Sequence, residues 1–154
     1  MNSVEIQTIF ESAGQPSEAQ IQLWVDTALA EVNHDTEIVV RIVDEQESAE
    51  LNEQYRHKQG PTNILSFPVE IPDGIDLDLL GDLVVCAPVL EQEALQQNKV
   101  LAHHWAHIII HGVLHLLGYD HLDDEQADDM ETKEITLLQQ LNIPNPYQQV
   151  ANHE

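Results

Sequence analysis

The sequence predicts an α+β fold, with a small mixed four-stranded sheet packed by about five helices around a central histidine-bearing helix. Three observations lead to this expectation. Apolar residues recur with the period of a strand in some segments and with helical spacing in others. The predicted elements follow the order β-α-β-α-β-β-α-α-α, which is not the strict alternation of a doubly wound fold. With 154 residues, 42% of them hydrophobic, we expect residues 1–154 to form one domain.

Two strands and a helix are predicted in the first part of the chain. Residues 3–10 alternate loosely between polar and apolar types, which indicates a strand. Ser17 and Gln20 have the spacing of a capping box, and Trp24 belongs to the apolar stripe of the helix that follows. We therefore expect Trp24 in the core. The β-branched run 36–43 indicates the second strand.

A second helix is predicted over about residues 45–57. Asp44 and Glu47 are placed to cap its start. Leu51 and Tyr55 are spaced to lie on one helical face, so we expect them to be buried. Gly60 and Pro61 follow and end the stretch.

The rest of the chain supplies two strands and three helices. Strands are predicted over 62–70 and 79–87, separated by an irregular loop with Pro72, Asp73 and Gly74. Helices are predicted over about 88–98, 101–117 and 123–141, and residues 142–154 are expected to be a partly ordered tail. The run DDEQADDMETKE that opens the last helix suits the helix dipole, and we expect a solvated face there.

The charge balance limits the possible partners. The formal net charge is −23, from 28 acidic and 5 basic side chains, which argues against broad electrostatic capture of nucleic acid or of anionic membranes. A small basic site remains possible, because Arg56 and Lys58 flank His57. The single cysteine, Cys86, excludes an internal disulfide and lies in an apolar run typical of a buried thiol. No basic and apolar leader is seen and no apolar run is long enough to cross a membrane, so we expect a cytoplasmic protein without membrane contact.

The clearest functional signal is the pattern H-x-x-x-H-x-x-G-x-x-H. His111 and His115 are four residues apart, so on a helix they share one face. Gly118 can end the helix in a left-handed conformation, and His121 can then return towards the first two imidazoles. Three neutral imidazoles with an open fourth position are typical of a catalytic zinc site. We therefore predict one Zn²⁺ on His111, His115 and His121, and we expect His107, one turn earlier, to have a structural role.

The spacing matches the zinc helix of metalloproteases except at one position. The glutamate that follows the first histidine in those enzymes is the general base, and here that residue is Gly112. A zinc ion lowers the pKa of bound water to about 7 and neutralises an oxyanion, which suits phosphodiester cleavage. Phosphate also needs a cation with matching geometry, and Arg56 is the candidate, although pairing with a nearby acid would explain it equally well.

These motifs are specific enough to indicate a family. HGVLHLLGYDH (111–121) resembles the signature of the YbeY family of bacterial metal-dependent endoribonucleases, and so do YRHKQGPTNILSFP (55–68) and LLGDLVVC (79–86). The resemblance implies a single-strand-specific endoribonuclease that acts in 3′-end maturation of small-subunit ribosomal RNA and in ribosome quality control. It implies zinc on His111, His115 and His121, with Arg56 and His111 as the catalytic residues. It also implies a fold related to the zincin metalloproteases.

Two other functions stay open from the residues alone. One is a different metal-dependent hydrolase, such as a peptidase, in which an acid like Asp120 would replace the missing glutamate. The other is a non-catalytic ribosome assembly factor with a structural zinc, whose fourth ligand would be His107. For the assembly factor, the acidic surface suggests contact with basic ribosomal proteins rather than with bare RNA, and such contact is compatible with a ribonuclease too. If the substrate is RNA, we expect weak, salt-sensitive affinity for free RNA and a partner that presents it. The nucleophile, either the 2′-hydroxyl or a water molecule, is left open too.

Overall fold

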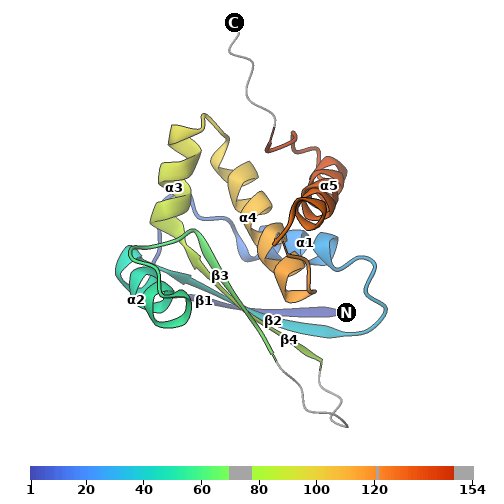
Figure 1. Ribbon diagram of the computed structural model, residues 1–154, viewed down its shortest axis with the longest axis horizontal. Coiled ribbons are helices and arrows are strands. Elements are labelled where there is room, and N and C mark those ends of the chain that lie inside the picture. The colour runs from blue at the N-terminus through green and yellow to red at the C-terminus, as the bar shows by residue number, and fades with distance from the viewer. Residues whose placement is uncertain (70–77, 121, 148–154) are drawn as a thin grey trace, which may run out of the picture.

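The computed structural model describes residues 1–69, 78–120 and 122–147 (Figure 1). It confirms an α+β fold with a mixed four-stranded sheet and five helices, in the order predicted from the sequence. The predicted loop with Pro72, Asp73 and Gly74, the predicted ligand His121 and residues 148–154 lie outside the described residues.

The sheet has the strand order β1-β2-β4-β3. β1 (Asn2–Thr8), β2 (Thr36–Val43) and β4 (Leu79–Cys86) are parallel, and β3 (Ile64–Pro68) runs antiparallel to β4 at the edge. Ile64 lies opposite Val85 and Pro68 opposite Gly81, which fixes the position of β3 along β4. α4 (Leu101–Leu116), the helix that carries the histidines, packs against both β3 and β4.

The described residues form five helices: α1 (Glu18–Ala28), α2 (Glu45–Arg56), α3 (Ala87–Gln96), α4 (Leu101–Leu116) and α5 (Asp124–Gln140). The two predicted N-caps are confirmed, since Ser17 forms a complete capping box with Gln20 and the Asp44 carboxylate accepts from the Glu47 amide. The main core lies where α1, α4 and α5 pack together on one face of the sheet, and α2 covers a smaller cluster on the opposite face (Figure 1). Trp24 is in the main core and Cys86 is a buried free thiol, as expected.

The expected buried face of α2 is wrong for Tyr55 and only partly confirmed for Leu51, which packs against the smaller cluster. Tyr55 is 57% exposed and Leu51 is only half-buried, whereas the buried residues of this helix are Ser48 and Asn52. These two polar side chains can be buried because both form hydrogen bonds. The Ser48 hydroxyl donates to the Thr62 carbonyl at 3.0 Å, and the Asn52 amide donates to the Gly60 carbonyl at 2.9 Å. α2 thus uses its polar face to hold the segment that leads into β3, and Tyr55 is left at the surface.

α4 is the central helix. Eleven of its residues are buried, from His104 to Leu116, and it packs against α1, α3, α5 and the sheet. A helix buried on most sides has little freedom to shift, so the side chains that it projects outward are held rigidly. No helix in the described part of the chain combines the length and apolar character needed to cross a bilayer.

Candidate metal centre

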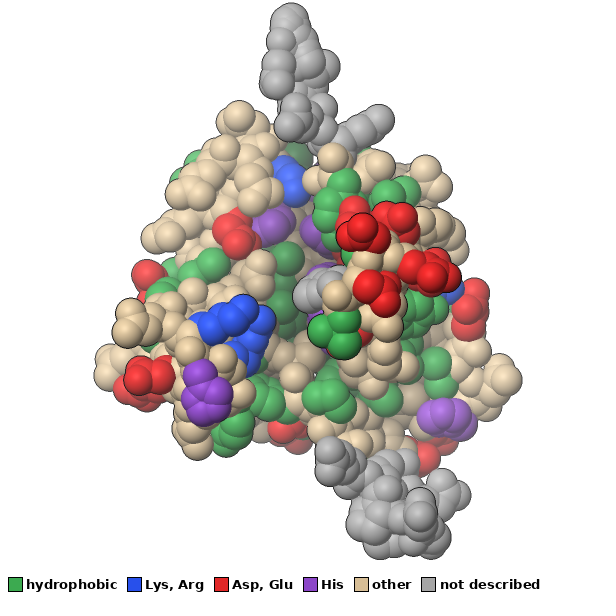
Figure 2. Space-filling view, in the orientation of Figure 1, with side chains coloured by type: hydrophobic (Ala, Val, Ile, Leu, Met, Phe, Trp, Pro, Cys, Tyr) green, Lys and Arg blue, Asp and Glu red, His purple; other side chains and the backbone are tan. Residues whose placement is uncertain are grey.

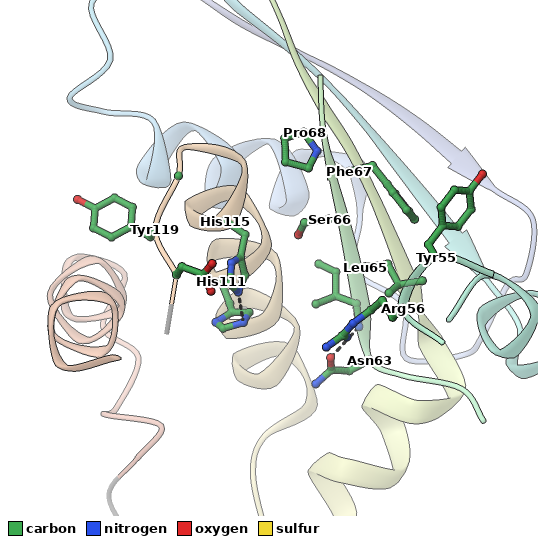
Figure 3. Close-up of a pocket in the computed structure, with 13 residues that line it drawn as sticks. Tyr55, Arg56, Asn63, Leu65, Ser66, Phe67, Pro68, His111, His115 and Tyr119 are labelled. Atoms are coloured by element: carbon green, nitrogen blue, oxygen red, sulfur yellow. Dashed lines mark hydrogen bonds between the residues drawn. The ribbon is translucent and has the colours of Figure 1, made fainter. Parts of the chain in front are cut away.

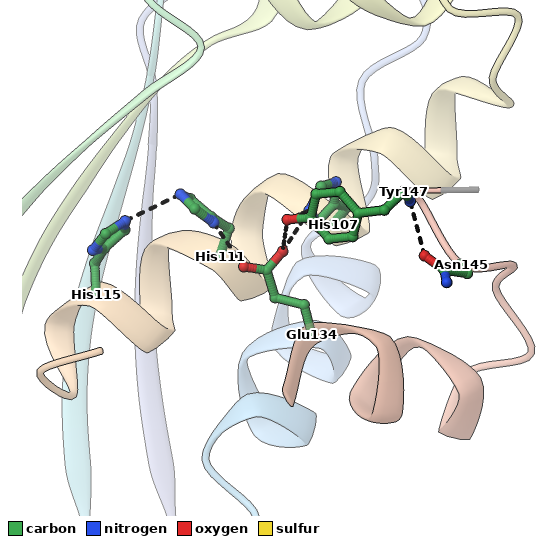
Figure 4. A network of polar contacts seen from close by, with 6 residues as sticks. All are labelled: His107, His111, His115, Glu134, Asn145 and Tyr147. Carbon is green, nitrogen blue, oxygen red and sulfur yellow. Dashed lines mark hydrogen bonds and ion pairs between the residues drawn. The ribbon is translucent and has the colours of Figure 1, made fainter. Parts of the chain in front are cut away.

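The half-exposed face of α4 carries the first two predicted ligands. His111 and His115 lie one turn apart, and their Nε2 atoms face each other at 3.1 Å (Figure 4). The rings are nearly perpendicular, with centroids 4.6 Å apart. Two imidazole nitrogens brought this close from i and i+4 positions can bind one ion together. The donor set and its geometry therefore fit a metal, and the predicted third ligand, His121, is not among the described residues.

Glu134 of α5 contacts His111 on the side of the ring that faces away from His115. One carboxylate oxygen accepts from Nδ1 of His111 at 2.8 Å, and the other accepts from Nε2 of His107 at 2.6 Å and from the Tyr147 hydroxyl at 2.6 Å (Figure 4). The Glu134 side chain is 0% exposed. A carboxylate that accepts from the outer nitrogen of a metal-binding imidazole is the usual partner of such ligands.

The electrostatics agree with an ionised Glu134. Burial alone would raise the pKa of Glu134, but the hydrogen bonds from His107, His111 and Tyr147 outweigh it and lower the pKa to about 2. Burial lowers the pKa of His107, partly opposed by Glu134, and burial raises the pKa of the Tyr147 hydroxyl. At neutral pH the network therefore contains a carboxylate that accepts from a neutral imidazole and a neutral phenol.

A second donor set shares His111. Ligand atoms of His107, His111 and Glu134 lie within 4.8 Å of one another and can also hold a metal ion. The expectation that His107 is structural agrees with its burial and with its hydrogen bond to Glu134. The two donor sets predict different effects on metal binding when His107 is replaced, because His107 is a ligand in only one of them.

The histidine pair opens into a groove of about 670 Å³. Its opposite wall is formed by the end of α2 and by β3, and Arg56 points from there into the space in front of His111 and His115 (Figure 3). Asp120, which sequence reasoning considered as an alternative base, lines the same groove. The full lining consists of Tyr55, Arg56, Asn63, Ile64, Leu65, Ser66, Phe67, Pro68, His111, His115, Gly118, Tyr119 and Asp120.

Arg56 differs from Arg41 and Lys133, which each form an ion pair with an acid. Arg41 pairs with Glu47 at 2.6 Å and Lys133 pairs with Glu31 at 3.0 Å, whereas Arg56 has no ion pair within the described residues. The pairing with a nearby acid that would have explained Arg56 is therefore not seen there. Figure 2 shows blue and purple side chains over the α2 region, beside a hollow where histidines gather, with red side chains concentrated over α5. The groove thus combines a guanidinium with a metal-type histidine pair.

Gly112 lies where α4 packs closely against the sheet. A Cβ at this position would lie 2.5 Å from Ile64 Cδ1 and 2.9 Å from Leu83 Cδ2, so a side chain there would force the ends of these two buried side chains to shift. The Ser66 hydroxyl donates a hydrogen bond to the Gly112 carbonyl at 3.2 Å, between the same two elements. At the position that holds the base in metalloproteases, the space next to the helix is therefore occupied by side chains of the sheet.

Gly112→Ala is expected to destabilise the protein by about 1–3 kcal/mol, as overpacking usually does. The sign is informative, because glycine to alanine inside an unhindered helix stabilises by about 1 kcal/mol. Urea unfolding followed by circular dichroism measures the change. A stabilised variant would contradict the close packing of α4 on β3 and β4.

Sequence patterns did not single out Glu134 or Tyr147. Glu134 belongs to the acidic run that was expected to be solvated, and for this residue the expectation is wrong. A signal was present: Glu134 lies in phase with Met130, Leu137 and Leu138, which form the buried stripe of α5. Tyr147 falls in the segment expected to be a partly ordered tail, and no local pattern connects it with α4.

Comparisons with known proteins agree over nearly the whole chain. The family described as Endoribonuclease YbeY matches residues 5–142. A protein named Endoribonuclease YbeY from Colwellia psychrerythraea is 54% identical over 148 residues, covering 94% of this chain and 96% of that protein. Another of the same name, from Pseudomonas syringae pv. syringae, is 49% identical over 148 residues, covering 96% and 89%. The solution structure of TM1509 from Thermotoga maritima has a similar fold, with a TM-score of 0.60 at 24% identity over 100% of this chain and 99% of that one.

Proposed function

The chain belongs to the Endoribonuclease YbeY family, and on that premise we propose that it is a zinc-dependent, single-strand-specific endoribonuclease that matures the 3′ end of small-subunit ribosomal RNA. Cleavage of RNA phosphodiester bonds follows from the family. The observation that carries the proposal is the groove in which Arg56 faces His111 and His115. Roles in ribosome quality control, contact with ribosomal proteins and a cytoplasmic location belong to the same proposal.

His111, His115 and His121 would hold the zinc ion. When bound, zinc supplies a Lewis acid that neutralises charge on a phosphate oxygen and can activate water. Glu134 keeps the Nδ1 proton of His111 in place, so that Nε2 faces the groove. The role of His111 in catalysis is thus to present one nitrogen at a fixed position beside His115.

Arg56 is the proposed phosphate clamp. Its guanidinium offers a planar fork that matches two phosphate oxygens, and the groove places it across from the histidines. A phosphodiester between the two walls would be held from both sides. Two nucleophiles would then be possible, and the product ends distinguish them. Attack by the 2′-hydroxyl of the preceding ribose would break the P–O5′ bond and leave a 2′,3′-cyclic phosphate and a 5′-hydroxyl. Attack by water with loss of the 3′ oxygen would break the P–O3′ bond and leave a 3′-hydroxyl and a 5′-phosphate.

The test is cleavage of a single-stranded RNA with and without chelator. The wild-type protein should cut only with metal present, and His111→Ala and Arg56→Ala should each reduce cutting severely. Cleavage that survives both substitutions would refute the assignment. Release of fragments from a peptide pool without RNA cleavage would favour the peptidase alternative, with Asp120, which lies in the groove, as its acid.

Tyr55 is expected to support the preference for single strands. Its exposed ring lines the groove next to Arg56 and is held edge-to-face by Phe67, with centroids 5.1 Å apart. Unpaired bases stack on such rings with about 1–3 kcal/mol each. Tyr55→Ala should therefore raise KM for single-stranded RNA while kcat changes little, and Tyr55→Trp should restore KM. Equal loss in both variants would show that the ring does not stack a base.

A further inference from the structure

Glu134 is buried where it touches both α4 and the segment after α5. Its Oε2 accepts from His111, and its Oε1 accepts from His107 and from Tyr147 (Figure 4). A carboxylate at 0% exposure would be very unfavourable without such donors. The three donors therefore fix the direction in which each oxygen points.

We propose that Glu134 and Tyr147 are positioning residues of the metal centre, so that the segment 142–147 is part of the support of His111. The inference rests on the proposed function for the identity of the metal ligands. By holding Oε1, Tyr147 and His107 direct Oε2 at Nδ1 of His111. This bond selects the tautomer with a lone pair on Nε2, the atom that faces His115 and the groove.

The segment that brings Tyr147 to this place is anchored to the core. The chain leaves α5 through Asn142 in a left-handed conformation (φ 61°), and the Ile143 amide donates to the Leu138 carbonyl at 2.9 Å. The Ile143 side chain is 8% exposed and belongs to the main core. The Asn145 side chain then accepts from the Tyr147 amide at 2.8 Å, and the Tyr147 ring lies edge-on to His107 with centroids 5.4 Å apart. Tyr147 is thus held independently of any metal.

The geometry favours orientation over direct ligation by Glu134. Both carboxylate oxygens already accept hydrogen bonds, and a metal between His107, His111 and Glu134 would have to displace them. His111 also presents Nε2, not Nδ1, to His115. A metal bound on the groove side, by Nε2 of His111 and Nε2 of His115, would therefore leave the hydrogen bonds of Glu134 intact.

The experiment measures zinc affinity by competition with a chromophoric chelator, and the absorption spectrum of the cobalt-substituted protein, on full-length variants without RNA. Glu134→Gln should weaken zinc binding by about 10- to 100-fold. Tyr147→Phe removes only the hydroxyl and should weaken binding by a smaller factor in the same direction, with the cobalt bands shifted.

The control is Glu93→Gln. Glu93 accepts from His104 at 2.8 Å, so the variant removes a similar bond between a carboxylate and a histidine of α4, but neither residue lines the groove. Its zinc affinity and cobalt spectrum should equal those of the wild type, even if urea unfolding shows a loss of stability. If Glu93→Gln lost as much zinc affinity as Glu134→Gln, the effects of Glu134 and Tyr147 would reflect a general loss of stability and not positioning of His111.

Two further outcomes overturn the proposal. If Tyr147→Phe leaves both affinity and spectrum unchanged, the hydroxyl does not position the site. If His107→Ala loses zinc as completely as His115→Ala, then Glu134 and His107 are ligands and not supports. The proposed function fails separately: normal zinc binding without RNA cleavage would refute the ribonuclease assignment and leave the positioning roles standing.

Discussion

His115→Ala is expected to lower zinc affinity by more than about 100-fold and to abolish RNA cleavage at ordinary zinc concentrations. The reason is that removal of one ligand should cost more than loss of an outer partner, which typically costs 10- to 100-fold. The side chain is half-buried and its Nε2 lies 3.1 Å from that of His111, so we expect alanine to leave the fold intact but to remove one nitrogen of the pair. Chelator competition and single-turnover cleavage of a fluorescent RNA measure the two effects.

His103→Ala is the matched control for this experiment. His103 belongs to the same helix but does not line the groove, so the same substitution should leave zinc affinity and cleavage close to wild type. Retention of tight zinc binding by His115→Ala would contradict the groove-side centre. It would direct attention to the second donor set, made of His107, His111 and Glu134.

Arg56→Ala is expected to reduce kcat/KM for RNA by about 10- to 150-fold, because a hydrogen bond to a charged group contributes about 1.5–3 kcal/mol. Arg56→Lys should recover only part of this, since an ammonium lacks the fork that engages two phosphate oxygens. Zinc affinity should not change in either variant. Steady-state cleavage of the same RNA at two ionic strengths measures the loss.

Arg41→Ala controls for the removal of one positive charge from a protein with a net charge of −23. Arg41 pairs with Glu47 away from the groove, so its loss should alter cleavage only slightly. If the two variants lose activity equally, the effect of Arg56 is one of overall charge, and the phosphate clamp is refuted.

The parts of this protein that are encoded locally were predictable. Ser17 with Gln20 and Asp44 with Glu47 cap helices through bonds three residues apart, and these caps appear as expected. The pair His111 and His115 follows in the same way from the helical repeat. In each case the two interacting residues are three or four positions apart, so their spacing in the sequence alone determines that they meet on the helix.

The supports of the site were not predictable in that way, because they depend on packing between distant segments. Glu134 reaches His111 only when α5 docks on α4, and nothing in the acidic run around it distinguishes a buried carboxylate from its solvated neighbours. Tyr55 was assigned to the core because its spacing suited an apolar face. The structure instead buries Ser48 and Asn52, which find carbonyl partners beyond the helix.

The internal bonding of the groove wall has a consequence for sequence preference. Asn63 could in principle read the edge of a base, but its amide nitrogen donates to Glu93 at 3.3 Å and its oxygen accepts from the Ile64 amide at 2.7 Å. Ser66 is similarly engaged with Gly112. In the proposed function, Arg56 would contact a phosphate and Tyr55 would stack on a base, and any nucleotide can make these two contacts. We therefore expect cleavage of isolated RNA to be tolerant of base identity, so that the choice of bond depends on where a partner holds the strand.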